Sequence, residues 1–175
     1  MATDGYIMQG PMKEMFDIQR MPTETVVKLP PAVVQQFAAI EQLLRTWGLH
    51  PDALTHCETA LKDLRRIYDS VAYFAESGQS IETGTVWIWP IHVPAPYVRL
   101  VQASCPPALV IFAYFAAVAS SVQLAWYNLN WSQCSIEGVS RVLGDDMQHW
   151  LQWPRAQIKD RMAVLGVPRS SPDAG

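Results

Sequence analysis

The chain has 175 residues, half of them hydrophobic and only 17% charged, and its formal net charge is −3. This length suits one domain, and the low charged fraction excludes a chain that is disordered throughout. The acidic balance offers no basic surface to a phosphate backbone, so we expect no direct nucleic-acid binding. We expect one helical domain over residues 31–166, after a partly ordered leader at 1–30 and before a disordered tail at 167–175.

Three cysteines, Cys57, Cys105 and Cys134, lie far apart and form no CxxC motif. The sequence therefore predicts no zinc cluster, iron–sulfur site or disulfide framework, and reduced thiols in an intracellular protein are the simplest interpretation. The N-terminal residues lack the basic and apolar segments of a secretory signal. We expect the protein in the nucleus or the cytoplasm.

Two amphipathic helices are predicted first. Proline at Pro30–Pro31 and glycine at Gly48 are typical of the two ends of a helix, and the apolar residues between them recur every three or four positions: Val33, Phe37, Ile40, Leu44 and Trp47. The next helix begins near Pro51, with Asp52 as its expected N-cap, and ends at Gly78. It has the clearest amphipathic pattern in the chain.

A segment rich in tryptophan and proline follows. Trp87 and Trp89 are followed by prolines at positions 90, 94 and 96. Proline interrupts both helix interiors and central strands, so we expect an extended connector with at most a short strand. Pro96 then opens a short helix that runs to about Ser104.

The most apolar stretch begins at Pro106–Pro107, and no charged residue lies between Arg99 and Glu137. Its length is sufficient for a membrane span. However, Tyr114, Ser120, Ser121 and Gln123 interrupt it, and no cluster of Lys or Arg flanks it. A helix that is apolar all round is also typical of the centre of a helical bundle, and we prefer this interpretation to a membrane span.

The C-terminal part predicts further helices. Asn130 is positioned to cap a helix that ends near Gly144, Asp145 to cap a short turn, and Pro154 to open a last helix that ends at Gly166. The chain as a whole is therefore predicted to be all-α, a compact bundle of about six or seven helices around the very apolar central one.

Polar residues give weak indications of chemistry. Asp145, Asp146 and His149 form a D-D-x-x-H pattern that could hold a metal or serve acid–base catalysis, but a capping cluster at a helix start explains it better. His92, between prolines, is more typical of a structural histidine than of a catalytic base. Cys134 has no histidine or carboxylate at a recognisable spacing. We expect no metal and no cofactor.

Aromatic residues crowd the C-terminal half, next to many alanines. Bulky rigid rings are difficult to pack without voids, so an apolar ligand pocket is a reasonable hypothesis although most rings must belong to the core. We expect it between the Trp87–Tyr97 segment and the apolar helix, which we expect to extend to Tyr127. Its candidate lining residues are Trp87, Trp89, Tyr97, Phe112, Phe115, Ala116, Trp126 and Trp131.

The order of motifs in this half resembles the C-terminal region of fungal binuclear-zinc-cluster transcription factors of the sterol-uptake-control type. The resemblance covers roughly residues 31–165 and is sharpest over 85–155. The matching motifs are Trp89–Pro90, Ala108 to Val118, Trp126–Tyr127, Trp131, Asp145–Asp146, and Trp150 with Trp153–Pro154. The cysteine-rich DNA-binding part and the basic linker of that family do not occur in this chain.

The resemblance implies an all-helical regulatory module that binds an apolar, sterol- or terpenoid-like molecule and controls expression of a metabolic pathway, such as secondary metabolism. It would pass its state to a transcriptional partner or to a homodimer. The alternative is a biosynthetic enzyme of the cyclase or pericyclase type, which would shape an apolar intermediate in the same cavity, with His92 or Asp146 as polar candidates. A structural dimerisation module without a ligand is a third hypothesis. We lean toward a role without catalysis.

Overall fold

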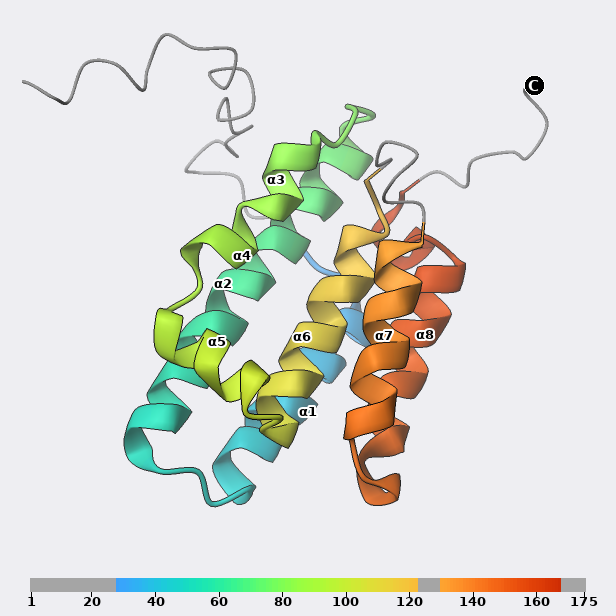
Figure 1. Ribbon diagram of the computed structural model, residues 1–175. Coiled ribbons are helices and arrows are strands. Elements are labelled where there is room, and N and C mark those ends of the chain that lie inside the picture. The colour runs from blue at the N-terminus through green and yellow to red at the C-terminus, as the bar shows by residue number, and fades with distance from the viewer. Residues whose placement is uncertain (1–27, 123–129, 168–175) are drawn as a thin grey trace, which may run out of the picture.

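The computed structural model describes residues 28–122 and 130–167, and every regular element within these two ranges is helical (Figure 1). The predicted all-α fold is confirmed. The predicted leader and tail lie largely outside the described residues. The elements are α1 (Pro31–Thr46), α2 (Pro51–Glu76), α3 (Thr83–Trp87), α4 (Trp89–His92), α5 (Ala95–Gln102), α6 (Pro106–Ala119), α7 (Trp131–Val142), η2 (Asp145–Leu151), α8 (Gln152–Lys159) and η3 (Ala163–Leu165).

Proline stands in the first turn of α1, α2, α4, α5 and α6. The first N–H groups of a helix have no acceptor within the helix, so proline is tolerated there. The expected N-cap of α2 is wrong by two positions: His50 is the N-cap, and its Nδ1 accepts a hydrogen bond from the backbone N–H of Asp52 at 3.4 Å. A carboxylate at Asp52 instead lies in the first turn, where it complements the helix dipole.

The expected extended connector over the tryptophan- and proline-rich segment is wrong, because this segment folds into the short helices α3 and α4. Pro90 lies in the first turn of α4 and Pro96 in the first turn of α5, so neither removes a helical hydrogen bond. Proline here separates consecutive short helices. The helix expected to begin at Pro96 is confirmed as α5, which ends at Gln102.

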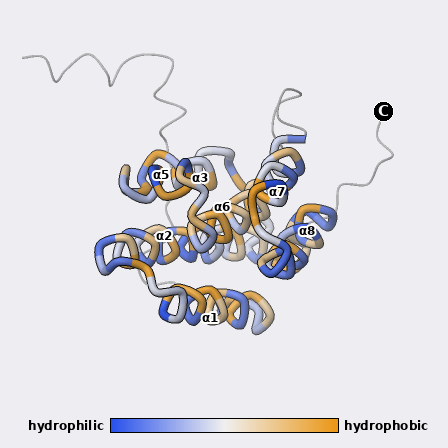
Figure 2. The backbone as a smooth tube through the Cα atoms, turned by 60° about the horizontal axis from the view of Figure 1, so that its bottom comes forward, coloured by the Kyte–Doolittle hydropathy of each residue, from blue (hydrophilic) through white to orange (hydrophobic). Residues whose placement is uncertain are grey.

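Helix α6 packs against α1, α2, α3, α5, α7 and α8, and the end-on view places it among its neighbours with α1 beneath α2 (Figure 2). Twelve of its fourteen residues are buried. The helix ends at Ala119, and just beyond this end the hydroxyls of Ser120 and Ser121 donate to the carbonyl oxygens of Ala117 and Val118, each at 2.6 Å. The expected continuation beyond this point is wrong for residues 120–122, and its remainder to Tyr127 lies outside the described residues.

The C-terminal helices begin and end differently from the sequence prediction. Gly144, not Asp145, is the N-cap of η2, and α8 begins at Gln152, which places Pro154 within its first turn. The predicted single helix up to Gly166 is interrupted, because Arg161 and Met162 have positive φ angles of 48° and 59°. This left-handed turn redirects the chain, and the Met162 side chain is fully buried.

A column of aromatic rings joins the C-terminal helices to the rest of the core. Trp153 of α8 stacks on Tyr114 of α6 with ring centroids 5.1 Å apart, and on Tyr68 of α2 at 6.4 Å. The ring of Phe37 from α1 meets Tyr68 edge-on at 5.0 Å. Four helices therefore share one aromatic core, whose edge-to-face and stacked contacts each add to the burial of apolar area.

None of the helices in the described ranges combines the length and apolarity that a membrane span needs; only α5 and α6 taken together would meet that criterion, and they are bent by 104° relative to each other.

Candidate functional site

Six of the predicted ligand-binding residues lie together in one cluster, which we call the aromatic cluster: Trp87, Trp89, Tyr97, Phe112, Phe115 and Trp131. They come from α3, α4, α5, α6 and the start of α7. Phe115 is the centre of the cluster, since its ring stacks on Trp89 at 4.6 Å and meets Trp87 and Trp131 edge-on, both at 5.7 Å. The sequence prediction thus identified rings that the fold brings together.

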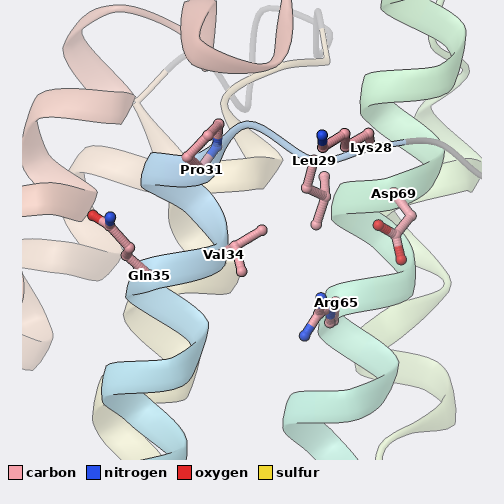
Figure 3. Close-up of a pocket in the computed structure, with 7 residues that line it drawn as sticks. All are labelled: Lys28, Leu29, Pro31, Val34, Gln35, Arg65 and Asp69. Atoms are coloured by element: carbon pink, nitrogen blue, oxygen red, sulfur yellow. The ribbon is translucent and has the colours of Figure 1, made fainter.

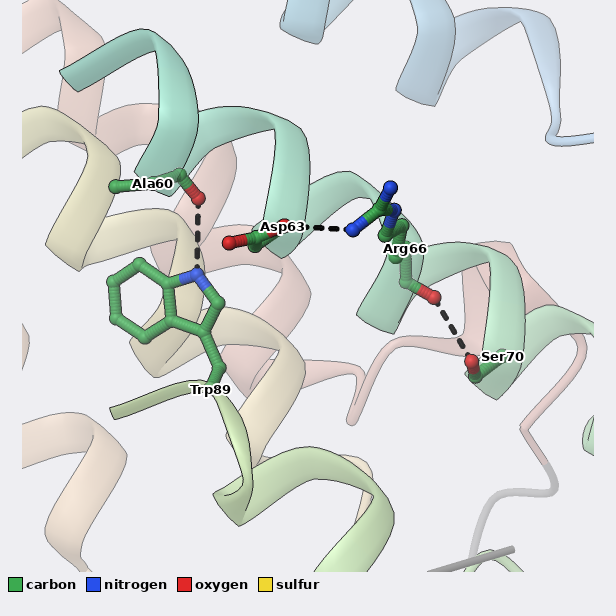
Figure 4. A network of polar contacts seen from close by, with 5 residues as sticks. All are labelled: Ala60, Asp63, Arg66, Ser70 and Trp89. Atoms are coloured by element: carbon green, nitrogen blue, oxygen red, sulfur yellow. Dashed lines mark hydrogen bonds and ion pairs between the residues drawn. The ribbon is translucent and has the colours of Figure 1, made fainter. Parts of the chain in front are cut away.

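The inner rings of the cluster are committed to the core. Trp89 is buried, and its indole N–H donates to the carbonyl oxygen of Ala60 in α2 at 3.0 Å (Figure 4). The buried Tyr97 hydroxyl donates to the carbonyl oxygen of Ala108 at 3.0 Å, and burial, with the nearby thiols of Cys57 and Cys105, raises the pKa of Tyr97 well above its ordinary value. Because both polar groups already have partners, these rings serve to position the helices.

The outer rings are only partly covered. Trp87, Phe112 and Trp131 are half-buried, and Trp131 links the other two, with ring centroids 4.7 Å from Trp87 and 6.1 Å from Phe112. Partly exposed aromatic rings at neighbouring positions form the kind of apolar surface that small-molecule sites use. The outer rings are therefore the part of the cluster that a ligand can reach.

The indole N–H of Trp87 is an anomaly in this cluster. Its nitrogen Nε1 is buried and has no hydrogen-bond partner among the described residues. Leaving a buried donor without an acceptor costs about 1–3 kcal/mol, and buried tryptophan N–H groups usually have a partner. Trp87 therefore holds a buried donor that no acceptor among the described residues satisfies.

The two remaining predicted ligand residues are Ala116 and Trp126, and the structure describes only the first. Ala116 belongs to α6 and is fully buried, as are Ala113, Ala117 and Ala119. Small side chains at these positions allow neighbouring helices to approach α6 closely. Trp126 lies outside the described residues. The cavity that we expected beside these alanines stays a prediction.

The polar candidates do not form a catalytic centre in the described part of the chain. His92 at the end of α4 and Asp146 in η2 are both exposed. His149 bonds through Nδ1 to the main-chain oxygen of Asp146 at 2.8 Å, so this imidazole is occupied by a local contact. No group of three His, Cys, Asp or Glu side chains in residues 28–122 and 130–167 is arranged to hold a metal ion.

The two thiols considered next, those of Cys57 and Cys134, do not form a reactive site with their described neighbours. Burial, followed by the neighbouring Cys105 and Glu58, raises the pKa of the Cys57 thiol to about 12. A thiol with this pKa stays protonated at neutral pH and is a poor nucleophile. The exposed Cys134 lies on α7 without a neighbouring base in the described contacts.

Sequence reasoning missed a groove between α1 and α2. Its volume is about 570 Å³ (Figure 3), and its lining residues are Lys28, Leu29, Pro31, Val34, Gln35, Arg65 and Asp69. A smaller pocket of about 300 Å³ adjoins it through Arg65. Charged side chains at such positions are typical of a solvated helix face, so no signal in the sequence distinguishes this groove.

Comparisons of the chain with models of protein families, with curated proteins and with solved structures found no match.

Proposed function

We propose that the protein is a regulatory module that binds an apolar, oxygen-bearing small molecule at the outer rings of the aromatic cluster. The ligand is sterol- or terpenoid-like, with most of its surface apolar and one hydroxyl or carbonyl oxygen. Its binding changes how the module engages a transcriptional partner or a second copy of the chain, and so changes the expression of a metabolic pathway.

The observation that carries this proposal is the buried indole N–H of Trp87, which has no hydrogen-bond partner within residues 28–122 and 130–167. Apolar binding sites typically use many hydrophobic contacts and very few polar groups that orient the ligand. Trp87, Phe112 and Trp131 supply the apolar contacts, and the Trp87 N–H supplies one donor. An oxygen that inserts between these rings would satisfy the donor and remove the cost of leaving it unpaired.

A ligand pair that differs by one oxygen tests the proposal. The full chain is titrated with a sterol that carries its 3-hydroxyl and with the matched sterane hydrocarbon, and tryptophan fluorescence and the melting temperature are recorded. We expect the sterol to bind about tenfold more tightly, since one hydrogen bond to a buried donor contributes about 1 kcal/mol or more. Stabilisation should grow with free ligand concentration.

Two variants assign this preference to a residue. Trp87→Phe keeps an aromatic ring but removes the N–H. The ratio of the affinities for the sterol and for the sterane should therefore fall to near one. Trp47→Phe, at an exposed position at the end of α1, is the matched control and should leave the preference unchanged. The proposal is wrong if neither compound binds, or if Trp87→Phe keeps the full preference.

The pathway role is tested in the producing cell. Deletion of the gene should abolish all products of the controlled pathway together, because a regulator acts on expression of every step. Accumulation of a single intermediate would instead identify an enzyme. The exposure of His92 and Asp146 gives that alternative no support from the described residues.

A further inference from the structure

A groove lies between α1 and α2, apart from the aromatic cluster. Its volume of about 570 Å³ lies within the range typical of small-molecule sites. It shares no residue with the aromatic cluster. Figure 3 shows that its walls come from the segment before α1, from the first turns of α1 and from the second half of α2.

One wall of the groove is apolar. Leu29, which is buried, lines the groove together with Pro31 and Val34 from the first turn of α1. Val34 is one of the few large aliphatic side chains that the described surface exposes, at 38% of its area. Covering such a side chain with an alkyl chain is favourable by about 25 cal/mol per Å² of apolar surface removed from water.

The polar side of the groove carries two cations and one acid: Lys28, Arg65 and Asp69. These charges sum to +1 when the carboxylate is ionised. Neither Lys28 nor Arg65 makes a salt bridge with any residue that the structure describes. Burial raises the pKa of Asp69, and the Arg65 guanidinium opposes this rise. The side chains of Arg65 and Lys28 are themselves exposed. A guanidinium binds a planar carboxylate through two parallel hydrogen bonds.

We propose that this groove binds a small amphiphilic carboxylate of the fatty-acid type. Its head group lies between Lys28 and Arg65, and its alkyl chain lies along Leu29 and Val34. This site is independent of the apolar ligand at the aromatic cluster, and the inference does not depend on the function proposed above.

Decanoate below its micellar concentration is the probe, measured by isothermal titration calorimetry with the full chain. Decanol has the same alkyl chain without the charge, and decyltrimethylammonium has the opposite charge. We expect decanoate to bind about tenfold more tightly than decanol, because charge-assisted hydrogen bonds to its carboxylate contribute more than neutral ones. Decyltrimethylammonium should bind more weakly than either.

Matched variants locate the site. Arg65→Gln and Lys28→Gln should each weaken decanoate binding by about fivefold or more, whereas Lys159→Gln, an exposed lysine on α8, should have no effect. Val34→Asp should weaken it further, whereas Val142→Asp, which makes the same change at an exposed position on α7, should not. Circular dichroism of each variant verifies that the helices are retained.

Three outcomes would overturn the inference: equal affinities for decanoate and decanol, decanoate binding that survives both Arg65→Gln and Lys28→Gln, or decanoate binding that Trp87→Phe abolishes. The last result would place the fatty acid at the aromatic cluster. Binding of decanoate that Trp87→Phe leaves unchanged supports the groove even if the proposed sterol site fails its own test.

Discussion

The hydroxyl of Tyr68 in α2 donates a hydrogen bond to the backbone carbonyl oxygen of Tyr114 in α6 at 2.8 Å, with both rings buried. The hydroxyl of Tyr114 in turn donates to Oε1 of Gln36 in α1 at 2.6 Å. A chain of two tyrosines thus connects three helices through polar contacts inside an apolar core. Such a network fixes how the helices are positioned relative to one another as well as how much surface they bury.

Tyr68→Phe should lower the free energy of unfolding by about 1 kcal/mol, because it removes one buried hydrogen bond and keeps the ring. The loss stays modest since the Tyr114 carbonyl lies within α6, where it also has a helical partner. Urea denaturation followed by circular dichroism measures the change. Tyr73→Phe, on the same helix with its ring half-buried, is the control; an equal loss in both variants would contradict a specific role for the Tyr68 hydroxyl.

Stability should fall at alkaline pH because of buried acids. Burial and its neighbours raise the pKa of Cys57 from 9.0 to about 12, so the unfolded chain releases this proton at a lower pH than the folded one. The favourable contribution is complete below pH 9 and is lost as the pH rises toward 12. The slope for this group is about 1.4 kcal/mol per pH unit.

Cys57→Ala should flatten this alkaline decline, measured as melting temperature against pH. Cys134→Ala, which removes an exposed thiol, should leave the decline as it is. Tyr68, Tyr97 and Tyr114 also have raised pKa values owing to burial, so part of the decline persists in Cys57→Ala. An identical pH profile for Cys57→Ala and the wild type would show that this thiol is not shielded from water.

Ser104→Gly should stabilise the protein. Ser104, between α5 and α6, is exposed and has a φ of 58°, a conformation that costs a non-glycine residue about 1–2 kcal/mol. The greater freedom of glycine in the unfolded chain offsets part of this gain, and we expect a net increase of about 0.5 kcal/mol in the free energy of unfolding.

Ser70→Gly should have the opposite effect, and calorimetry measures the melting temperatures of both serine variants. Ser70 lies inside α2, and its hydroxyl donates to the carbonyl oxygen of Arg66 at 2.9 Å. Glycine in a helix interior should lower the stability by about 0.5–1 kcal/mol. A decrease in melting temperature for both serine variants would mean that a contact of the Ser104 side chain stabilises the fold by more than its backbone strain destabilises it.

Ala116→Phe distinguishes a packed helix interface from a void. Ala116 is fully buried in α6, so a phenyl ring should cost about 1–3 kcal/mol through overpacking. Ala39→Phe, at an exposed position of α1, should change stability little. If Ala116→Phe keeps the wild-type melting temperature, space exists beside it, and the expected cavity lies there after all.

The two long N-terminal helices could be predicted because their apolar residues recur at helical spacing between a proline and a glycine. Gly48 and Gly78 end these helices with positive φ angles of 78° and 69°, which glycine adopts without strain. The turn after α8 carries no such signal, because Arg161 and Met162 adopt the same region without glycine. Burial of Met162 compensates for the strain, and only the tertiary structure reveals that burial.

The sequence predicted which rings form the aromatic cluster, but it could not predict the different environments of these rings. The sequence indicated that Trp87, Trp89 and Phe115 belong together, because an aromatic-rich segment stands close to a very apolar, alanine-rich helix, although that segment was expected to be extended. The sequence could not reveal that the Trp89 N–H has a partner in α2 while the Trp87 N–H has none in the part of the chain that the structure describes. The groove near Arg65 was not predictable either, because its lining is assembled from two helices and the segment before them.

The stacking of Trp153 on Tyr114 means that the helix synthesised last among the four completes the shared aromatic core. Helices α1, α2 and α6 leave the ribosome well before α8, and until then one face of their shared aromatic core stays open to water. The nascent chain therefore exposes an apolar surface until α8 has emerged, and such a surface favours aggregation. The aromatic core is complete only when α8 has packed against α6 and α2.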